Sequence, residues 1–219
     1  MVYTPVNMDF YIILVLILIT SVVIHEVAHG YAAYLLGDST AKLQGRLTLN
    51  PLVHLDPMMS VIVPGLLIMS GSPILFGAAK PVPYNPYNFT DQKWGEAKVA
   101  IAGPLANIVI ALVVGIILHL TPLLNLPASL IEIGVLTITL NIFLAFFNLL
   151  PIPPLDGSKV WPMFLPYDWR MKYEEFRLKL ERNIFLSFAL IILLVFYVLG
   201  GPLYSATLAL TSLISGVSL

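Results

Sequence analysis

The sequence contains no cysteine. This absence excludes disulfide bonds, thiolate metal ligands and cysteine nucleophiles, although it does not identify the redox compartment. The N-terminal residues MVYTPVNMD also lack lysine and arginine. Because a secretory signal peptide needs a basic start, we expect none here, and the first apolar run should remain in the mature protein.

Charge is scarce as well. Only 11% of the 219 residues are Asp, Glu, Lys or Arg, whereas 58% are hydrophobic. A globular domain is typically about 25% charged and roughly 45–50% apolar, so the chain has too little polar surface to dissolve a compact fold of this size. The composition therefore predicts an all-α polytopic membrane protein. The net charge of −1 argues against a nucleic-acid partner, which requires a basic surface.

Long apolar runs identify the segments expected to cross the bilayer. A spanning helix needs about 20 such residues, and the chain has runs of this kind at 10–36, 97–120, 130–150 and 184–217. In the last run, Gly200-Gly201-Pro202 either kinks one long helix or separates two short ones. The run at 58–69 is too short to cross and contains Pro64-Gly65, so we expect a re-entrant segment there.

The distribution of lysine and arginine predicts the orientation. Six of these residues lie in the loop 151–183 and two in 37–57, but none lies in 121–129. Because basic loops stay on the cytoplasmic side, the N-terminus should be outside and the loops 37–57 and 151–183 inside. Both ends of the re-entrant segment then lie inside. We expect an integral, multi-pass protein of a prokaryotic cell membrane.

The first apolar run contains the motif HEVAH at residues 25–29. His25 and His29 are four residues apart and share one face of a helix. Two imidazoles placed in this way can bind zinc, and Glu26 between them can activate a bound water molecule. Ionisable groups inside a membrane helix cost roughly 2.5–3.5 kcal/mol each on insertion scales. A functional role is therefore favoured over a structural cluster or a proton relay.

A catalytic zinc ion usually has a third protein ligand. The remaining candidates are the loop acids together with His54, His119, Glu132 and Asp156. Asp156 fits best, because it lies in NLLPIPPLDG, whose prolines end the helix 130–150 at the inner face. His25 lies roughly 23 Å from the outer end of its helix at 1.5 Å per residue, in the inner third of a ~30 Å hydrocarbon core. The two motifs thus reach the same depth.

Other polar residues have simpler interpretations beside functional ones. His54 is either an accessory group of the site or an ordinary loop histidine. Asn107 and Asn141 are best explained by hydrogen bonds between helices. The segment RMKYEEFRLKLER at 170–182 has the basic pattern of an amphipathic or juxtamembrane segment on the inner leaflet.

Three motifs in order resemble a known family. These are HEVAH at 25–29, AGPLAN at 102–107 and NLLPIPPLDG at 148–157. Together they resemble the site-2 proteases, which are zinc intramembrane metalloproteases of the M50 class. GRLTLNP at 45–51 and AKPVPYNP at 79–86 resemble the compact branch of that family, which has no PDZ domain.

The resemblance implies specific roles for five residues. His25, His29 and Asp156 would bind one Zn²⁺ ion per chain, and Glu26 would be the general base. Asn148 matches the asparagine that positions the substrate or stabilises the oxyanion. The implied function is zinc-dependent cleavage of transmembrane segments, as in regulated intramembrane proteolysis. Its partners would be single-span membrane proteins and the lipid bilayer, with the active site toward the cytoplasm.

The resemblance also implies an architecture. A three-helix catalytic core would be followed by C-terminal helices, and extended segments around 43–50 and 72–86 would form a small sheet that binds the substrate strand. We expect a single membrane protease domain over residues 1–219, with its core at 10–160 and its C-terminal segments at 184–217.

Two other functions remain open from the residues. A transporter or channel would use His25, Glu26 and His29 as an ion or proton site, but it would need polar residues along a path to both faces. A prenyl-protein protease would take its third zinc ligand from a glutamate on a helix, and the LDG context of Asp156 argues against it.

Overall fold

The computed structural model describes residues 8–56, 62, 69 and 79–218. This part of the chain is helical, with short 3-10 turns and no β-strand. Its α-helices are α1 (Met8–Leu35), α2 (Thr40–Leu43), α4 (Gly95–His119), α5 (Thr121–Leu124), α6 (Ala128–Asn148), α7 (Gly157–Val160), α8 (Tyr167–Glu181), α9 (Ile184–Leu194) and α10 (Gly200–Ser215). The 3-10 turns are η1 (Pro51–His54), η3 (Pro86–Asn88) and η4 (Trp161–Phe164), and a π-helical turn, η5 (Val195–Leu199), joins α9 to α10.

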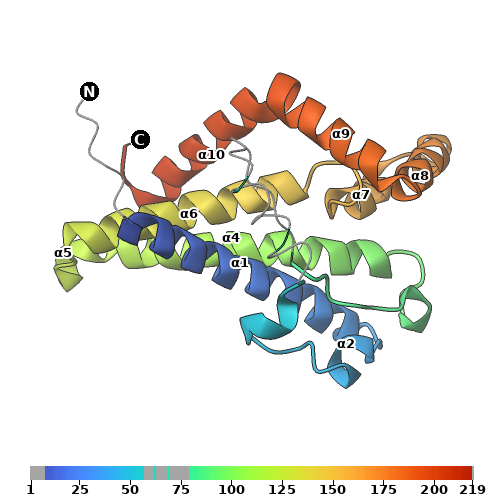
Figure 1. The fold of residues 1–219 in the computed structure, drawn as a ribbon, viewed down its shortest axis with the longest axis horizontal. Helices are drawn as coiled ribbons and strands as arrows, with labels where there is room; N and C mark the ends of the chain where they lie inside the picture. Colours follow the sequence, from blue (N-terminus) through green and yellow to red (C-terminus); the bar gives the residue numbers. More distant parts are fainter. Residues whose placement is uncertain (1–7, 57–61, 63–68, 70–78, 219) are drawn as a thin grey trace.

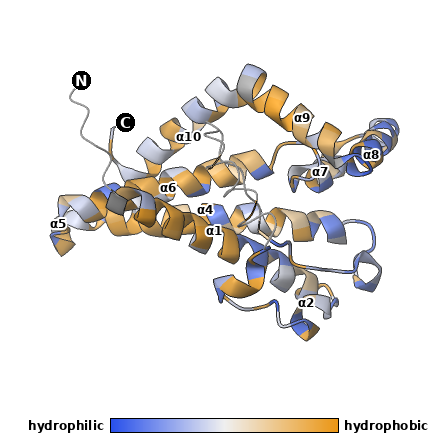
Figure 2. Ribbon diagram, in the orientation of Figure 1, coloured by the Kyte–Doolittle hydropathy of each residue, from blue (hydrophilic) through white to orange (hydrophobic). Residues whose placement is uncertain are grey.

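Four helical segments are long and apolar enough to cross a membrane. They are Phe10–Leu35, Gly95–His119, Ala128–Asn148 and Phe185–Ser215. Their apolar residues dominate the long helices in Figure 2, whereas the hydrophilic residues gather at α8 and around α2. The predicted all-α, polytopic class is confirmed, and the protein is an integral, multi-pass membrane protein.

The helices α1, α4 and α6 pack side by side as the predicted three-helix core, and α10 lies against α6 and α4 (Figure 1). Between α4 and α6, the residues Ala111, Leu118, Ile138 and Ile142 form a buried apolar cluster that Ile214 of α10 joins. Helices meet here by close packing, because lipid provides no hydrophobic drive between them. The division of the chain into a single domain stays a prediction.

The C-terminal apolar stretch is one continuous bent segment. The helix α9 passes without a break through the π-helical turn η5 into α10, and the arch that they form is visible above α6 in Figure 1. A π-turn and a proline are both recognised causes of helix bending, and Pro202 lies three residues after the turn, in the first turn of α10. The break at Gly200-Gly201-Pro202 therefore bends one helix and does not separate two.

The predicted small sheet is not present in the described residues. Residues 43–50 form the end of α2, a turn and a pair of bends, so the expectation of a strand there was wrong. The reason is local: Asn50 N–H donates to Thr48 Oγ1 at 3.2 Å, and Thr48 O accepts from the His54 ring at 2.9 Å. Side chains thus satisfy groups that a strand would offer to a neighbour. The re-entrant segment 58–69, apart from residues 62 and 69, and residues 72–78 lie outside the described part.

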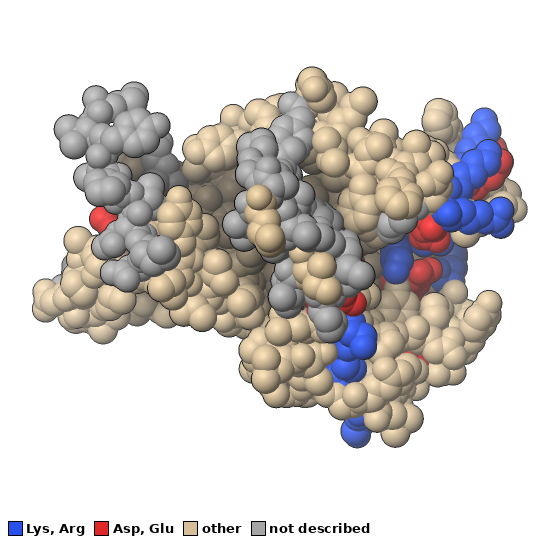
Figure 3. Space-filling view, viewed as in Figure 1, with Lys and Arg blue, Asp and Glu red and all other residues tan. Residues whose placement is uncertain are grey.

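Charged side chains concentrate at one end of the molecule. Figure 3 shows most of the visible ones toward α8 and α2, while the rest of this face is largely uncharged. The predicted amphipathic segment forms the helix α8. Inside helix α4, Pro104 is buried next to Gly103, which membrane helices tolerate where neighbouring helices cover the freed backbone groups.

Candidate metal centre

Helix α1 places two buried imidazoles on one face. His25 and His29 are one turn apart, each is 7% exposed, and their Nε2 atoms are 3.0 Å apart. This confirms the geometry that the spacing of four residues predicts for a helix. The two rings meet edge to face at 88°.

Asp156 reaches the same point from the other side. Helix α6 ends at Asn148, and the proline-rich turn that follows leads back into α7 at Gly157. A Cβ atom at Gly157 would overlap the carbonyl oxygen of Leu149, so only glycine allows this tight return. The carboxylate Oδ2 of Asp156 lies 3.1 Å from His25 Nε2 and 3.4 Å from His29 Nε2. The structure therefore brings the three predicted ligands together.

The outward-facing nitrogens of both histidines have hydrogen-bond acceptors. His25 Nδ1 lies 2.6 Å from Asn107 Oδ1, and His29 Nδ1 lies 2.8 Å from the carbonyl oxygen of Val99. Since neither oxygen carries a hydrogen, both imidazoles must be protonated on Nδ1. Their Nε2 atoms then present lone pairs toward each other and toward Asp156, and such outer hydrogen bonds are typical of metal-binding histidines.

The orientation of the Asn107 amide is itself determined. Its Nδ2 donates to Asn141 Oδ1 at 2.8 Å, and Asn141 Nδ2 donates to the Thr137 carbonyl, which can only accept, at 2.9 Å and to Ser21 Oγ at 2.9 Å. A relay of three buried side chains thus connects α4, α6 and α1 to the ring of His25. The interhelical hydrogen bonds predicted for Asn107 and Asn141 are present. Their connection to His25 was not predicted, and the sequence offered only the AGPLAN motif as a signal.

The three donors suit a zinc ion. Their ligand atoms lie within 4.8 Å of one another. A tetrahedral zinc with bonds of about 2.0–2.1 Å holds its ligands roughly 3.3 Å apart, close to the observed separations. Among the described residues, Asp156 Oδ2 is buried without a hydrogen-bond donor. Three converging acceptors that lack a proton between them favour a cation.

Gly103 lets helix α4 approach the two histidines. A Cβ atom at this position would lie 2.5 Å from His29 Nε2 and 2.6 Å from His25 Nε2. Any side chain on Gly103 would therefore occupy the space where the two nitrogens converge.

We expect Gly103→Ala to lower zinc affinity by at least about tenfold, because outer contacts that hold the ligands are worth roughly 10- to 100-fold and the methyl group displaces both rings. Zinc content after competition with a chelator measures this. Gly201→Ala is the matched control, since a Cβ there meets nothing within 4 Å. Unchanged zinc affinity in Gly103→Ala would show that the two histidines do not bind the metal together.

Glu26 lies beside the histidines and is half-buried. Its Oε2 accepts a hydrogen bond from the backbone N–H of Val82 at 2.8 Å. The carboxylate is thus held by a segment that is distant in sequence. This contact was not predicted from the sequence.

The other predicted residues lie as follows. Asn148 is partly buried at the end of α6, and its Nδ2 donates to the Leu144 carbonyl at 3.0 Å, so its role toward substrate stays a prediction. His54 is buried, and its Nε2 lies 2.9 Å from Thr48 O. Among the described residues, only His25, His29 and Asp156 form a group able to hold a metal.

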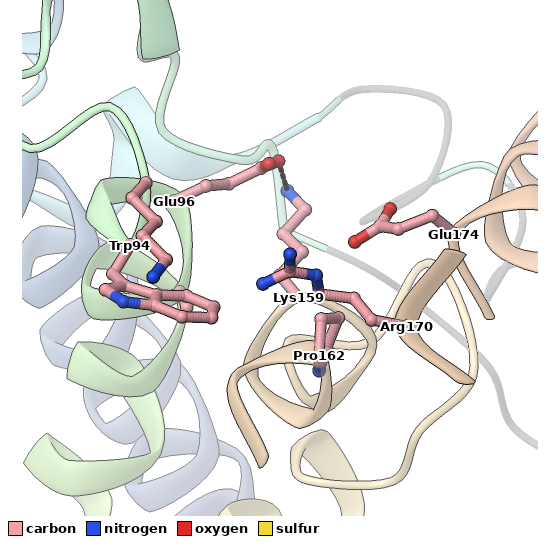
Figure 4. Close-up of a pocket in the computed structure, with 8 residues that line it drawn as sticks. Trp94, Glu96, Lys159, Pro162, Arg170 and Glu174 are labelled. Atoms are coloured by element: carbon pink, nitrogen blue, oxygen red, sulfur yellow. Dashed lines mark ion pairs between the residues drawn. The ribbon is translucent and has the colours of Figure 1, made fainter. Parts of the chain in front are cut away.

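Ion pairs hold the loop that carries Asp156 against α4. Lys159 donates to Tyr84 Oη at 2.5 Å and lies 3.7 Å from Glu96 Oε1, as does the Arg177 guanidinium. Burial would lower the pKa of Lys159, but Tyr84 and Glu96 outweigh it and raise the pKa. Figure 4 shows Glu96 and Lys159 at a pocket of about 240 Å³ that Lys93, Trp94, Ala97, Pro162, Arg170 and Glu174 also line.

Comparison with known proteins identifies the family. Residues 125–196 match the sequence model of Peptidase family M50. The chain is 39% identical over 176 residues to "Putative zinc metalloprotease YwhC" of Bacillus subtilis, an alignment that covers 78% of this chain and 76% of the relative. The chain belongs to peptidase family M50.

Two further relatives of this M50 chain are longer than it. "Putative zinc metalloprotease Rip2" of Mycolicibacterium smegmatis is 34% identical over 147 residues, covering 63% of this chain and 51% of the relative. Zinc metalloprotease MJ0392 of Methanocaldococcus jannaschii is 27% identical over 190 residues, covering 86% of this chain and 44% of the relative. No solved structure matches the chain. The predicted resemblance to the M50 class is confirmed.

Proposed function

We propose that this M50 protein is a zinc-dependent intramembrane endopeptidase that cleaves transmembrane segments of other membrane proteins. The protein is a zinc metalloprotease by family. The observation that carries the proposal is the convergence of His25, His29 and Asp156 beside a carboxylate, on helices long enough to span a membrane. A protease built into such helices acts on substrates that share the bilayer.

The chemistry is divided among few residues. His25, His29 and Asp156 would hold the zinc ion, which when bound acts as a Lewis acid and lowers the pKa of water toward about 7. Glu26 would accept a proton from the attacking water and deliver it to the leaving amine. Asn148 would orient the substrate carbonyl and stabilise the oxyanion. This assignment makes Glu26 the residue whose loss stops the chemical step.

Access of water favours an opening at the charged end of the molecule. Asp156 lies in irregular backbone after α6, and such backbone is tolerated at membrane depth only where protein packs over it or a wet cavity adjoins it. The helix α8 lies at the same end, in the loop 151–183 that contains six lysine and arginine residues. By the positive-inside rule this end faces the cytoplasm, so the active site would be reached from the cytoplasmic side of the cell membrane.

A substrate helix has to unwind before it is cut, because its amides are hydrogen-bonded within the helix. Single-span membrane proteins with helix-breaking residues near the cytoplasmic end would therefore be preferred substrates. The bilayer itself is the second partner, since it delivers the substrate laterally.

The test is cleavage in proteoliposomes that contain the purified protein and single-span substrates. We expect cuts within spans that contain Gly or Pro, few or none in a matched polyleucine span, loss of cleavage with a zinc chelator and recovery when zinc is added back. Gel electrophoresis with mass spectrometry locates the cut. Cleavage that persists in the chelator, or cuts only in the substrates' water-soluble domains, would contradict the proposal.

A further inference from the structure

The segment Lys80-Pro81-Val82-Pro83, here called the KPVP segment, passes directly beside Glu26. It has two backbone N–H groups, because proline has none. Lys80 N donates to the His54 carbonyl at 2.8 Å, and Val82 N donates to Glu26 Oε2 at 2.8 Å. Both donors are therefore used inside the protein. Within these four residues a substrate strand therefore finds no free backbone donor.

Two carbonyl groups of the same segment are held by a buried arginine. Arg46 is 5% exposed, and its Nη2 donates to Lys80 O at 2.7 Å and to Pro81 O at 3.3 Å. The backbone N–H of Arg46 is itself bonded to Ala41 O at 2.9 Å, at the end of α2. Arg46 and His54 thus hold Lys80 and Pro81, the two residues before Val82, by hydrogen bonds.

The chain after the KPVP segment is fastened by Asp38. This buried carboxylate accepts hydrogen bonds from Asn85 N at 2.8 Å and from Asn88 Nδ2 at 2.7 Å. Burial alone would raise the pKa of Asp38, but these bonds and those from Thr40 outweigh it, so the pKa is lowered. The chain is therefore held by hydrogen bonds on both sides of Val82: by Arg46 and His54 before it and by Asp38 after it.

The side chain of Val82 is seated against helix α1. It is 5% exposed, and a Cβ atom on Gly30 would lie 2.9 Å from Val82 Cγ1. Gly30 is four residues after Glu26 and so lies one turn further along the same face of the helix. The absence of a side chain at Gly30 brings the Val82 backbone within reach of the Glu26 carboxylate.

We propose that the KPVP segment positions the general base, with Arg46 as the positioning residue that holds it. This inference rests on the proposed function. Arg46 binds the Lys80 and Pro81 carbonyls and so directs the Val82 N–H at Glu26 Oε2. The hydrogen bond keeps one carboxylate oxygen in place and leaves the other, Oε1, to take the proton. Small displacements of a catalytic group cost up to about 100-fold in rate, so a hydrogen bond that fixes the Glu26 carboxylate should raise the rate of cleavage.

The direct test removes one hydrogen from the backbone. Val82→Pro deletes the N–H, and Val82→Ala is its matched control because it keeps the N–H while shortening the side chain. We expect Val82→Pro to lower kcat by roughly ten- to a hundredfold, in line with the misplacement of a catalytic group, with KM within about twofold of wild type and zinc content unchanged. Val82→Ala keeps the N–H but loses part of the side-chain contact with Gly30, so it should lose clearly less kcat than Val82→Pro.

Arg46 variants provide a second test that does not alter the KPVP segment. We expect Arg46→Met to lower kcat at least about tenfold with zinc still bound, and Arg46→Lys, which can still donate to both carbonyls, to recover most of the loss. A residue that only stabilised the fold would change zinc content or thermal stability together with kcat. Thermal unfolding in detergent is therefore measured for every variant.

Three results would overturn the inference: wild-type kcat in Val82→Pro and Arg46→Met, an equal loss of kcat in Val82→Ala and Val82→Pro, or loss of zinc in parallel with kcat in the Arg46 variants. The proposed function fails in a different way, when wild-type protein does not cleave or when Glu26→Gln still does. If Glu26→Gln is inactive and Val82→Pro is fully active, the positioning role of the KPVP segment is rejected and the proposed function stands.

Discussion

Replacing Glu26 with glutamine should lower the rate of cleavage by more than about a thousandfold while zinc remains bound. General bases contribute about 10²- to 10⁴-fold, and here the same carboxylate would also protonate the leaving amine. Glutamine has nearly the same shape, and its amide oxygen can still accept the Val82 N–H that lies 2.8 Å from Glu26 Oε2. The variant therefore removes the base without leaving a buried donor unpaired.

Initial rates on one single-span substrate, together with metal analysis of the same sample, measure this effect. The control is Glu132→Gln, which changes an acid at the opposite end of the helical core, in the first turns of α6, and should cleave at the wild-type rate. Substantial cleavage by Glu26→Gln would mean that another group takes the proton, and the assignment of the base would be withdrawn.

Asp156→Ala should release the metal. The substitution removes one of the three proposed ligands and leaves His25 and His29, whose Nε2 atoms are 3.0 Å apart, as the other two members of the group. Since outer contacts alone are worth about 10- to 100-fold in metal affinity, losing a direct ligand should cost more than about a hundredfold. Cleavage should fall below detection at ordinary zinc concentrations.

Zinc per chain after dialysis against a weak chelator measures this loss. Asp168→Ala is a suitable control, because this exposed acid lies in the first turn of α8. Full zinc content in Asp156→Ala would show that a different side chain completes the site. A glutamate on a helix, as in the prenyl-protein proteases, would then be the alternative.

Several features follow from local pattern alone. The apolar runs predicted three core helices, and the observed ends of α4 and α6 differ from the predicted ones by two residues or fewer. The joint position of His25 and His29 follows from the helix period. The position of Asp156 followed from depth, because the prolines after α6 stop the helix at the level that His25 reaches along α1.

Other features depend on contacts between distant segments. No sequence pattern predicts the hydrogen bond between the Asn107 amide and the His25 ring, or the one from the Val82 N–H to Glu26. Such contacts depend on how each helix is rotated about its own axis, which packing decides. The strand predicted at 43–50 failed for a local reason, since the Thr48 hydroxyl and the His54 ring bond backbone groups that a strand would offer to a neighbour.

The chain's amino acids therefore decided the class of molecule, the helices and the three donor residues, because hydrophobic length and helix period are local properties. Tertiary structure alone decided how these donors become a site. Close approach at Gly103 and Gly30, the relay through Asn107 and the grip of Arg46 on the KPVP segment arise only when α1, α4 and the loops pack together. A zinc ligand can be recognised by its spacing, but the proton on its other nitrogen is placed by a neighbour from another helix.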